Sequence, residues 1–283
     1  LVGSEMCIRD SSVTGGVPKY IELFSESSDI YRAIQKCVLN RSGYLYDEPH
    51  FLLQQEVSEV GSYFSIIKAI AAGNHKLSTI AAVLEVKSTN LTKYLKTLMD
   101  LDILERRVPV TEGNPEKSKR GLYKIKDNYL RFWFAFIYPN MSFIESGHSG
   151  IVMDKIRKGL TTSHIGFVYE DICQERMWEL NVNNAWPFQF SKLGGYWDAK
   201  NEIDIAALDP EGKNLILGEC KYWKEPVGLN VLHALETKAC DVAWERDRRK
   251  VWYVLFSISG FSDELRNHAA TRDDLLLIDD GER

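Results

Sequence analysis

Two charged residues follow an apolar run in the last third of the chain. The stretch "LILGECKYW" (215–223) begins with apolar residues typical of a buried strand and ends with Glu219 and Lys221 in close succession. Moving an isolated charge from water into a protein interior is costly unless the charge is paired. These side chains therefore need a partner or a function.

The preceding strand supplies a partner. The stretch "EIDIAAL" (202–208) is joined to residue 215 by "DPEGKN", whose Asp, Pro and Gly are typical of a turn. If Leu208 pairs with Leu215, Asp204 faces Glu219. Because side chains alternate along a strand, one face then carries Glu202, Asp204, Glu219 and Lys221, and beyond them Ala206, Leu208, Leu215 and Leu217. The other face carries Ile203, Ile205, Ala207, Ile216 and Cys220, so the pattern predicts an interior hairpin.

The opposed carboxylates predict a cation between them. Asp204 and Glu219 would lie about 5 Å apart between Cβ atoms, where like charges destabilise a sheet. Mg²⁺ or Mn²⁺ would remove this repulsion, since Mg²⁺ is commonly held by one or two carboxylates and several waters. Lys221 would then stabilise charge on a phosphate or align an attacking water. The plainer alternative is a salt bridge on a strand, without catalysis.

A third carboxylate is predicted on the helix before these strands. In "HIGFVYEDICQERMWEL" (164–180), Glu170 shares a mostly apolar helical face with Cys173 and Met177. Glu170 is therefore expected to point at the sheet. Three aromatic residues near the acidic pair would either stack on a base or pack at the rim of the core: Trp197, Tyr222 and Trp223.

The surrounding pattern predicts an α/β domain over residues 146–283. The expected helices cover 162–180, 229–245 and 263–271, and the expected strands lie near 187–193, 201–208, 215–222, 250–257 and 275–279. A helix before three strands, followed by βα alternation, indicates a mixed sheet flanked by helices. Lys238 could face the acidic pair, but Leu235 and Ala239 indicate that its helix mainly covers the sheet.

Residues 56–145 have the element order of a winged helix-turn-helix. Three helical patterns, the last two beginning at Ser78 and Ser88, precede two strand patterns with a polar loop between them. The third helix and the strands present basic residues of the kind that contact DNA. The residues expected to bind nucleic acid are Thr89, Asn90, Lys93, Lys96, Arg106, Arg107, Lys119 and Arg120. The alternatives are a solvated face and a protein docking module.

Composition and short motifs argue against several other classes of protein. The 283 residues carry a net charge of −5, so nucleic-acid binding must come from local patches. The densest apolar stretch, "FWFAFIY" (132–138), is far shorter than a membrane span. Five scattered cysteines without a CxxC pair and six histidines without an HExxH motif argue against a disulfide framework and a zinc enzyme. A cytoplasmic protein without a membrane partner is expected.

Several segments together resemble known families. A helix with Glu170, a strand with Asp204 and a strand with Glu-x-Lys are similar to the PD-(D/E)xK nuclease superfamily. More closely, "GGVPKYIE", "RFWFAFIYPN", "GFVYED", "NEIDIAAL" and "LGECKYW" resemble the C-terminal part of archaeal-type P-loop ATPases. Such proteins combine an ATPase, a winged helix and a nuclease-like domain of unassigned function. The resemblance covers nearly everything after residue 13.

The resemblance implies roles for individual residues. Glu170, Asp204 and Glu219 would be metal ligands, joined by the carbonyl of Cys220, and Lys221 would be the catalytic lysine. ATP would bind only to an upstream ATPase core in cis, because this chain has no G-x-x-x-x-G-K-[ST] motif.

The expected fold is therefore α+β and multidomain. Residues 1–12 would be a non-native leader, since "LVGSEMCIRDS" resembles translated sequencing-adapter DNA. Residues 13–55 would be a helical remnant of the ATPase lid, 56–145 the winged helix, and 146–283 a restriction-endonuclease-like domain. The expected function is DNA binding with Mg-dependent phosphodiester hydrolysis. The alternatives are a non-catalytic DNA-binding or regulatory module of an ATP-binding protein and a transcription regulator that uses only the winged helix.

Overall fold

The computed structural model describes residues 5–281, which divide into two compact units. The helical unit comprises residues 9–107 and 121–164, and the sheet unit comprises residues 5–8, 108–120 and 165–281. The predicted segments 13–55 and 56–145 thus share most of one unit, and residues 146–164 pack with them. Within the described residues, no helix is both long enough and apolar enough to cross a membrane.

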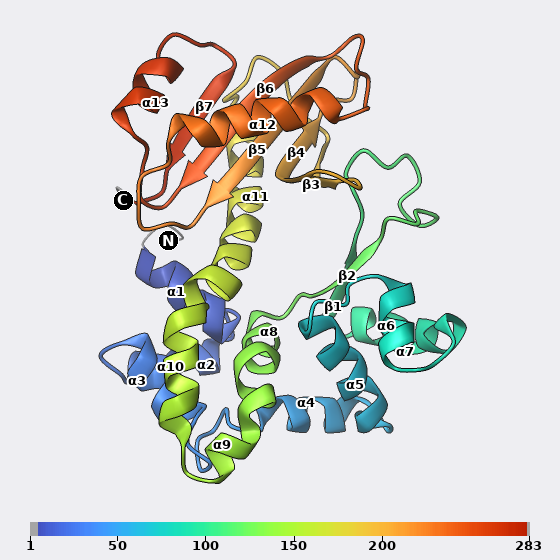
Figure 1. The fold of residues 1–283 in the computed structure, drawn as a ribbon, viewed down its shortest axis with the longest axis vertical. Coiled ribbons are helices and arrows are strands. Elements are labelled where there is room, and N and C mark those ends of the chain that lie inside the picture. The colour runs from blue at the N-terminus through green and yellow to red at the C-terminus, as the bar shows by residue number, and fades with distance from the viewer. Residues whose placement is uncertain (1–4, 282–283) are drawn as a thin grey trace. The chain divides into compact units, whose positions relative to one another are not determined.

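Helices dominate the chain up to residue 165 (Figure 1). The α-helices are α1 (Glu5–Thr14), α2 (Pro18–Ser25), α3 (Ile30–Cys37), α4 (Glu48–Glu56), α5 (Val60–Ala71), α6 (Leu77–Val83), α7 (Ser88–Asp100), α8 (Asn128–Phe132), α9 (Met141–Glu145) and α10 (Ser149–Leu160). Tighter or wider turns extend some of them: the π-helical η1 (Trp133–Ile137), the 3₁₀-helical η2 (Tyr138–Asn140) and the π-helical η3 (Thr161–Ile165).

The aromatic segment around η1 forms the centre of the helical unit. Trp133 is buried and donates from its indole N–H to the carbonyl of Tyr46 at 2.9 Å. Tyr129 is also buried, and its ring lies 5.2 Å from that of Tyr20. On another side Phe64 packs edge-on against Trp133, with ring centroids 5.7 Å apart. The segment 13–55 therefore packs on the aromatic segment and does not form a core of its own.

The elements from α5 to the β-ribbon follow the predicted order. Helix α7 begins at Ser88 as expected and buries Leu91, Leu95 and Leu98. Helix α6 begins at Leu77, one residue before the predicted Ser78. Strands β1 (Leu104–Arg107) and β2 (Leu122–Ile125) pair antiparallel.

The sheet unit contains the predicted mixed sheet. Its strands, in spatial order, are β3 (Lys192–Trp197), β4 (Glu202–Leu208), β5 (Asn214–Lys221), β6 (Lys250–Ser257) and β7 (Leu275–Asp279). The pairs β3–β4 and β4–β5 are antiparallel, whereas β5–β6 and β6–β7 are parallel. Its helices are α11 (Gly166–Val182), α12 (Leu229–Asp241) and α13 (Asp263–Ala269).

The first strand of this sheet begins later than predicted. A strand is expected near 187–193, but β3 starts at Lys192. The reason is the side chain of Asn181 at the end of α11, which donates to the carbonyl of Phe190 at 3.1 Å and accepts from its N–H at 3.0 Å. These bonds replace a strand partner, so the residues before Ser191 form a loop.

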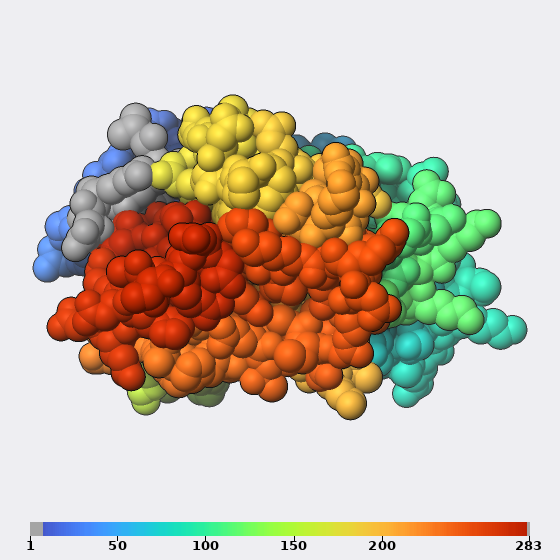
Figure 2. All heavy atoms as spheres, turned by 90° about the horizontal axis from the view of Figure 1, so that it is seen from above, coloured from blue at the N-terminus to red at the C-terminus, as the bar shows by residue number. Residues whose placement is uncertain are grey.

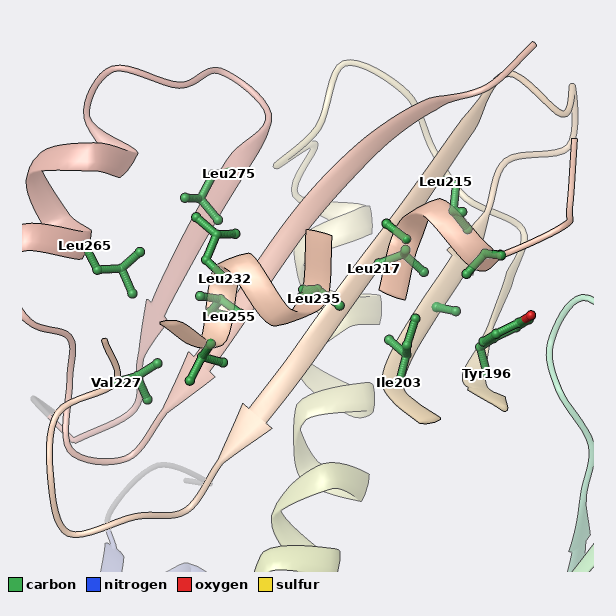
Figure 3. Packing of buried hydrophobic residues seen from close by; sticks show 14 of the residues in the cluster. Tyr196, Ile203, Leu215, Leu217, Val227, Leu232, Leu235, Leu255, Leu265 and Leu275 are labelled. Carbon is green, nitrogen blue, oxygen red and sulfur yellow. The ribbon is translucent and has the colours of Figure 1, made fainter. Parts of the chain in front are cut away.

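Helix α12 lies in front of the sheet in Figure 1 and α11 lies behind it. Leu232 and Leu235 of α12 pack against Leu217 and Leu255 of the sheet (Figure 3). Seen from above, the orange and red segments that include α12 and α13 form one closely packed face of the sheet unit (Figure 2). Two layers of helix thus enclose the sheet, which places both faces of the β4–β5 hairpin in protein.

A β-bulge interrupts the alternation of β4. Gly194 pairs with Ala206 and Tyr196 pairs with Ile203, so the single residue Gly195 lies opposite two residues of β4, Asp204 and Ile205. As a result, Ile203 packs with Leu217 on the α12 side of the sheet (Figure 3). The prediction that Ile203 lies on the other face is wrong, because strict alternation ignores this extra residue.

The loop between β1 and β2 belongs to the sheet unit. The N–H of Val110 donates to the carbonyl of Gly195 at 3.0 Å. Trp197 donates from its indole N–H to the carbonyl of Arg120 at 3.1 Å. The loop therefore covers the outer edge of β3, next to the bulge.

Candidate functional site

Asp204 lies where strands β4 and β5 stop pairing. The ladder runs from Leu208 opposite Leu215, as predicted, to Ile205 opposite Gly218, and it ends there. Asp204 therefore does not face Glu219 through a ladder pair. Instead its Oδ2 accepts a hydrogen bond of 2.9 Å from the backbone N–H of Cys220. The carboxylate thus takes over the position of a ladder partner between the separating strands.

Glu219 is held by two lysines. Its side chain is buried, with 7% of its surface exposed. One oxygen, Oε2, accepts from Nζ of Lys221, and the other, Oε1, accepts from Nζ of Lys238 at 2.6 Å. Lys238 also donates to the carbonyl of Glu202 at 2.7 Å, which ties α12 to β4.

Lys221 joins the two carboxylates. Its Nζ lies 3.3 Å from Oδ2 of Asp204 and also contacts Oε2 of Glu219. Because one ammonium group reaches both carboxylates, Asp204 and Glu219 open toward a common space. We call these four residues, Asp204, Glu219, Lys221 and Lys238, the charged quartet. It contains two formal positive and two formal negative charges.

The surroundings move the two acidic pKa values in opposite directions. Burial, and next the charge of Glu219, raise the pKa of Asp204, and Lys221 opposes this only in part. Burial also acts to raise the pKa of Glu219, but the charge of Lys221 and hydrogen bonds from Lys221 and Lys238 lower it below its usual value. The pKa of Lys221 rises despite burial, because both carboxylates stabilise its ammonium form. At neutral pH, Glu219 and Lys221 are therefore charged.

The two carboxylates of the quartet fit a hard divalent cation. Asp204 and Glu219 offer carboxylate oxygens close to the same point, and Mg²⁺ needs only one or two such ligands because it keeps several waters. Glu170 lies half-buried on α11, close enough for its charge to raise the pKa of the Cys220 thiol, although burial is the larger cause. Within residues 5–281 no three His, Cys, Asp or Glu side chains gather as a metal-binding group. Ligation by Glu170 and by the Cys220 carbonyl stays a prediction.

The aromatic residues near the quartet have different surroundings. Tyr222 is buried against Tyr169, with ring centroids 5.6 Å apart. Trp197 is half-buried and bonded to the loop before β2. Trp223 is 47% exposed, and its ring centroid lies 5.8 Å from Nζ of Lys221. Of the three, Trp223 is the one on the surface beside the quartet.

The residues predicted to bind nucleic acid fall into two groups. Four on α7 are exposed: Thr89, Asn90, Lys93 and Lys96. Lys119, in the loop before β2, is exposed as well. The arginines are engaged within the protein. Arg107 forms an ion pair with Glu105 at 2.5 Å, Arg120 pairs with Glu112, and the guanidinium of Arg106 packs against Gly121. A contact with nucleic acid stays a prediction for all of them.

Lys238 belongs to the charged quartet but not to the site predicted from the sequence. The apolar neighbours Leu235 and Ala239 are buried against the sheet, as expected. Lys238 lies three residues after Leu235, so it shares the helix face that covers the sheet and extends to the end of β5. A lysine on a face that must cover an acidic pair is the signal that would have identified it.

Comparisons with known proteins find similarity over the segment that contains these residues. Residues 133–239 match the DUF234 family, described as archaeal and bacterial proteins of unknown function. This segment contains Glu170 and the whole charged quartet. An uncharacterized protein of Methanocaldococcus jannaschii is 38% identical over 210 residues, which are 74% of this chain and 46% of that protein. The chain thus spans about half the length of that relative.

A solved structure gives a more distant likeness. It is the crystal structure of a repair endonuclease from Pyrococcus abyssi, with 9% identity and a TM-score of 0.25. The likeness covers 38% of this chain and 46% of the endonuclease chain. A TM-score at this level does not establish a shared fold.

Proposed function

We propose that the sheet unit hydrolyses phosphodiester bonds in DNA with a divalent cation held by Asp204 and Glu219. The observation that carries this proposal is the convergence of both carboxylates on the ammonium group of Lys221. Two acids and a lysine at the ends of adjacent strands match the arrangement that the PD-(D/E)xK resemblance implies. We extend the proposal to the fold of the sheet unit, as a nuclease-like domain.

The residues divide the chemistry as follows. Asp204 and Glu219 would hold the cation, which would stabilise charge on the phosphate and lower the pKa of a bound water. Lys221 would donate to a phosphate oxygen and so stabilise the charge that builds up during attack. Lys238 fixes the orientation of Glu219 through Oε1 and connects it to β4. Asp204 is oriented in the same way by the N–H of Cys220.

We also propose that α5, α6 and α7 with the β1–β2 ribbon form a winged helix that contacts DNA. The support is the exposed polar face of α7, which includes Lys93 and Lys96. An upstream P-loop ATPase, which the family resemblance implies, is part of the same proposal. Reading the genomic DNA upstream of residue 13 tests it, because an in-frame G-x-x-x-x-G-K-[ST] motif is expected there.

One observation favours a second function. The quartet balances its own charges, so it can persist as a buried ion-pair network without a metal. In that case the sheet unit is a non-catalytic module that tethers or regulates a DNA-bound protein. The two functions predict different results when metal and DNA are supplied together, because only the first predicts that the DNA is cleaved.

A plasmid-nicking assay distinguishes them. The wild-type protein should nick supercoiled DNA with Mg²⁺ or Mn²⁺, and chelation should abolish the activity. Asp204→Asn should remove it. The matched control is Lys213→Met with Glu211→Gln, an exposed ion pair in the turn of the same hairpin, and it should retain wild-type activity. Equal nicking by wild type and Asp204→Asn would indicate contamination, and no nicking by the wild type would favour the non-catalytic module.

A further inference from the structure

The two lysines of the charged quartet hold Glu219 in unequal ways. Lys238 binds Oε1 of Glu219 at 2.6 Å and is anchored by the carbonyl of Glu202 at 2.7 Å. The anchor belongs to the backbone of β4, so Lys238 is fixed between a helix and a strand. Lys221 has no such backbone anchor among the hydrogen bonds of its ammonium that the structure describes. Its Nζ contacts the two carboxylates, Asp204 and Glu219.

The ammonium of Lys221 lies between the two carboxylates that would hold a metal ion. Nζ of Lys221 contacts Oδ2 of Asp204 and Oε2 of Glu219, so a cation held by these two oxygens would compete with the ammonium for the same position. An ammonium group and a divalent ion repel each other strongly at such distances. Only one of them can occupy this position.

We propose that Lys221 is an exchangeable cation of this site. It pairs with both Asp204 and Glu219 until a divalent ion displaces it, and the displaced ammonium is then free to bind a phosphate. This inference rests on the proposed function, because it concerns the same carboxylates. It adds a way in which metal would control the activity of the site. Without metal, Lys221 stays paired with the two carboxylates, and metal binding would release it at the same time.

The exposed ring of Trp223 marks the side to which Lys221 moves. The ring centroid lies 5.8 Å from Nζ, and 47% of the residue is exposed. Its backbone is held in place, since Ser259 donates from its hydroxyl to the carbonyl of Trp223. An aromatic face attracts a cation, so a displaced ammonium keeps a partner at the edge of the site. The indole of Trp223 should therefore report the displacement.

Calorimetric titration with Mg²⁺ or Mn²⁺ alone, without nucleic acid, tests the exchange. Lys221→Met removes the competing charge and keeps an apolar stem of similar length. It should bind the ion at least about tenfold more tightly than the wild type. Lys213→Met, in the exposed turn of the same hairpin, should bind like the wild type. Equal or weaker binding by folded Lys221→Met would overturn the inference, and so would the absence of binding in both proteins at millimolar metal.

A second measurement does not depend on the folding of that variant. Titrating the wild type with Mg²⁺ should change the tryptophan fluorescence along the same isotherm, and Trp223→Phe should abolish most of the change. Calorimetric binding without a Trp223-dependent change would also overturn the exchange. Failure of the proposed function has a different signature, which is wild-type protein that does not nick DNA with Mg²⁺. If the wild type nicks DNA but Lys221→Met binds metal no more tightly than the wild type, the exchange is overturned and the proposed nuclease function stands.

Discussion

The backbone N–H of Cys220 donates a hydrogen bond of 2.9 Å to Oδ2 of Asp204, just beyond the last pair of the β4–β5 ladder. The bond lets the strands separate without leaving a buried donor unpaired. It also holds the carboxylate at the position where it meets Lys221. The local backbone and the candidate chemistry therefore depend on the same side chain.

Replacing Asp204 should reveal both roles. Asp204→Ala leaves the N–H of Cys220 without its acceptor, and an unsatisfied buried donor costs about 1–3 kcal/mol. Asp204→Asn keeps an oxygen that can accept this bond, so it should lose much less stability. Urea unfolding gives the two free energies, and amide hydrogen exchange at Cys220 should be faster in the alanine variant alone. If both variants exchange this amide equally fast, the bond does not hold the strand ends.

The pair of Glu219 and Lys238 should show a measurable coupling. A double-mutant cycle with Glu219→Gln and Lys238→Met is expected to give an interaction energy of about 1–3 kcal/mol, because the pair is largely shielded from water and the residues are in direct contact. The exposed pair of Lys213 and Glu211 serves as the control, and its coupling should be much weaker. Additive effects at Glu219 and Lys238 would show that Lys238 does not position the carboxylate.

The spacing of apolar residues and the composition of the sequence are enough to predict much of the sheet unit. The strand patterns near 201–208, 215–222 and 250–257 all correspond to strands, because each is a short apolar run with a clear boundary. The turn "DPEGKN" correctly predicts the pairing of Leu208 with Leu215. A mixed sheet with flanking helices follows from the order of these elements.

Other features depend on contacts between residues far apart in the chain. The bulge opposite Gly195 is invisible to a period-two pattern, and it moves Ile203 to the other face. The late start of β3 depends on the side chain of Asn181, nine residues before the backbone that it binds. The role of Lys238 requires knowing where α12 lies over the sheet. The family resemblance suggests the acidic residues, but it does not suggest that two lysines balance them.

Gly218 should be essential for the close packing of the strand that carries Glu219. A Cβ at this position would lie 2.9 Å from the carbonyl oxygen of Val254 and 3.2 Å from Cβ of Ile205. Gly218→Ala should therefore destabilise the protein by about 1–3 kcal/mol, since the strands on both sides must shift. Gly113→Ala is the control, because nothing lies within 4 Å of the added carbon there. Thermal unfolding that lowers the Tm equally in both variants would contradict this account.

His164 should make the helical unit sensitive to acid. It is fully buried, and its Nε2 lies 2.6 Å from the carbonyl oxygen of Ser12, so Nε2 carries the proton of the neutral ring. Burial lowers the pKa of His164 from 6.5 to about 4. Between these values the unfolded chain binds one more proton than the folded chain, so stability falls as the pH falls from about 6.5 to about 4.

The expected size of this effect is about 2 kcal/mol between pH 7 and pH 5. Urea unfolding at both values measures it. His164→Phe fills the same space without a titrating group, so it should lose stability at pH 7 but show a smaller difference between the two pH values. His233→Gln, an exposed histidine of the sheet unit, should keep the wild-type difference. A pH dependence that is unchanged in His164→Phe would contradict the assignment.

Lys93 and Lys96 should carry part of the salt dependence of DNA binding. Both are exposed on α7, where the proposed winged helix would meet the phosphate backbone. Each lysine that neutralises a phosphate contributes about 0.9 to the slope of log K against log salt concentration. Lys93→Ala with Lys96→Ala should therefore lower the affinity for duplex DNA and reduce that slope by about 1.8. Fluorescence anisotropy at several salt concentrations measures both quantities.

Lys19→Ala with Lys36→Ala is the matched control, because it removes the same total charge as the Lys93 and Lys96 double variant. These exposed lysines pair with Glu22 and Glu26. Equal slopes in the two double variants would favour a protein docking role for this face of α7.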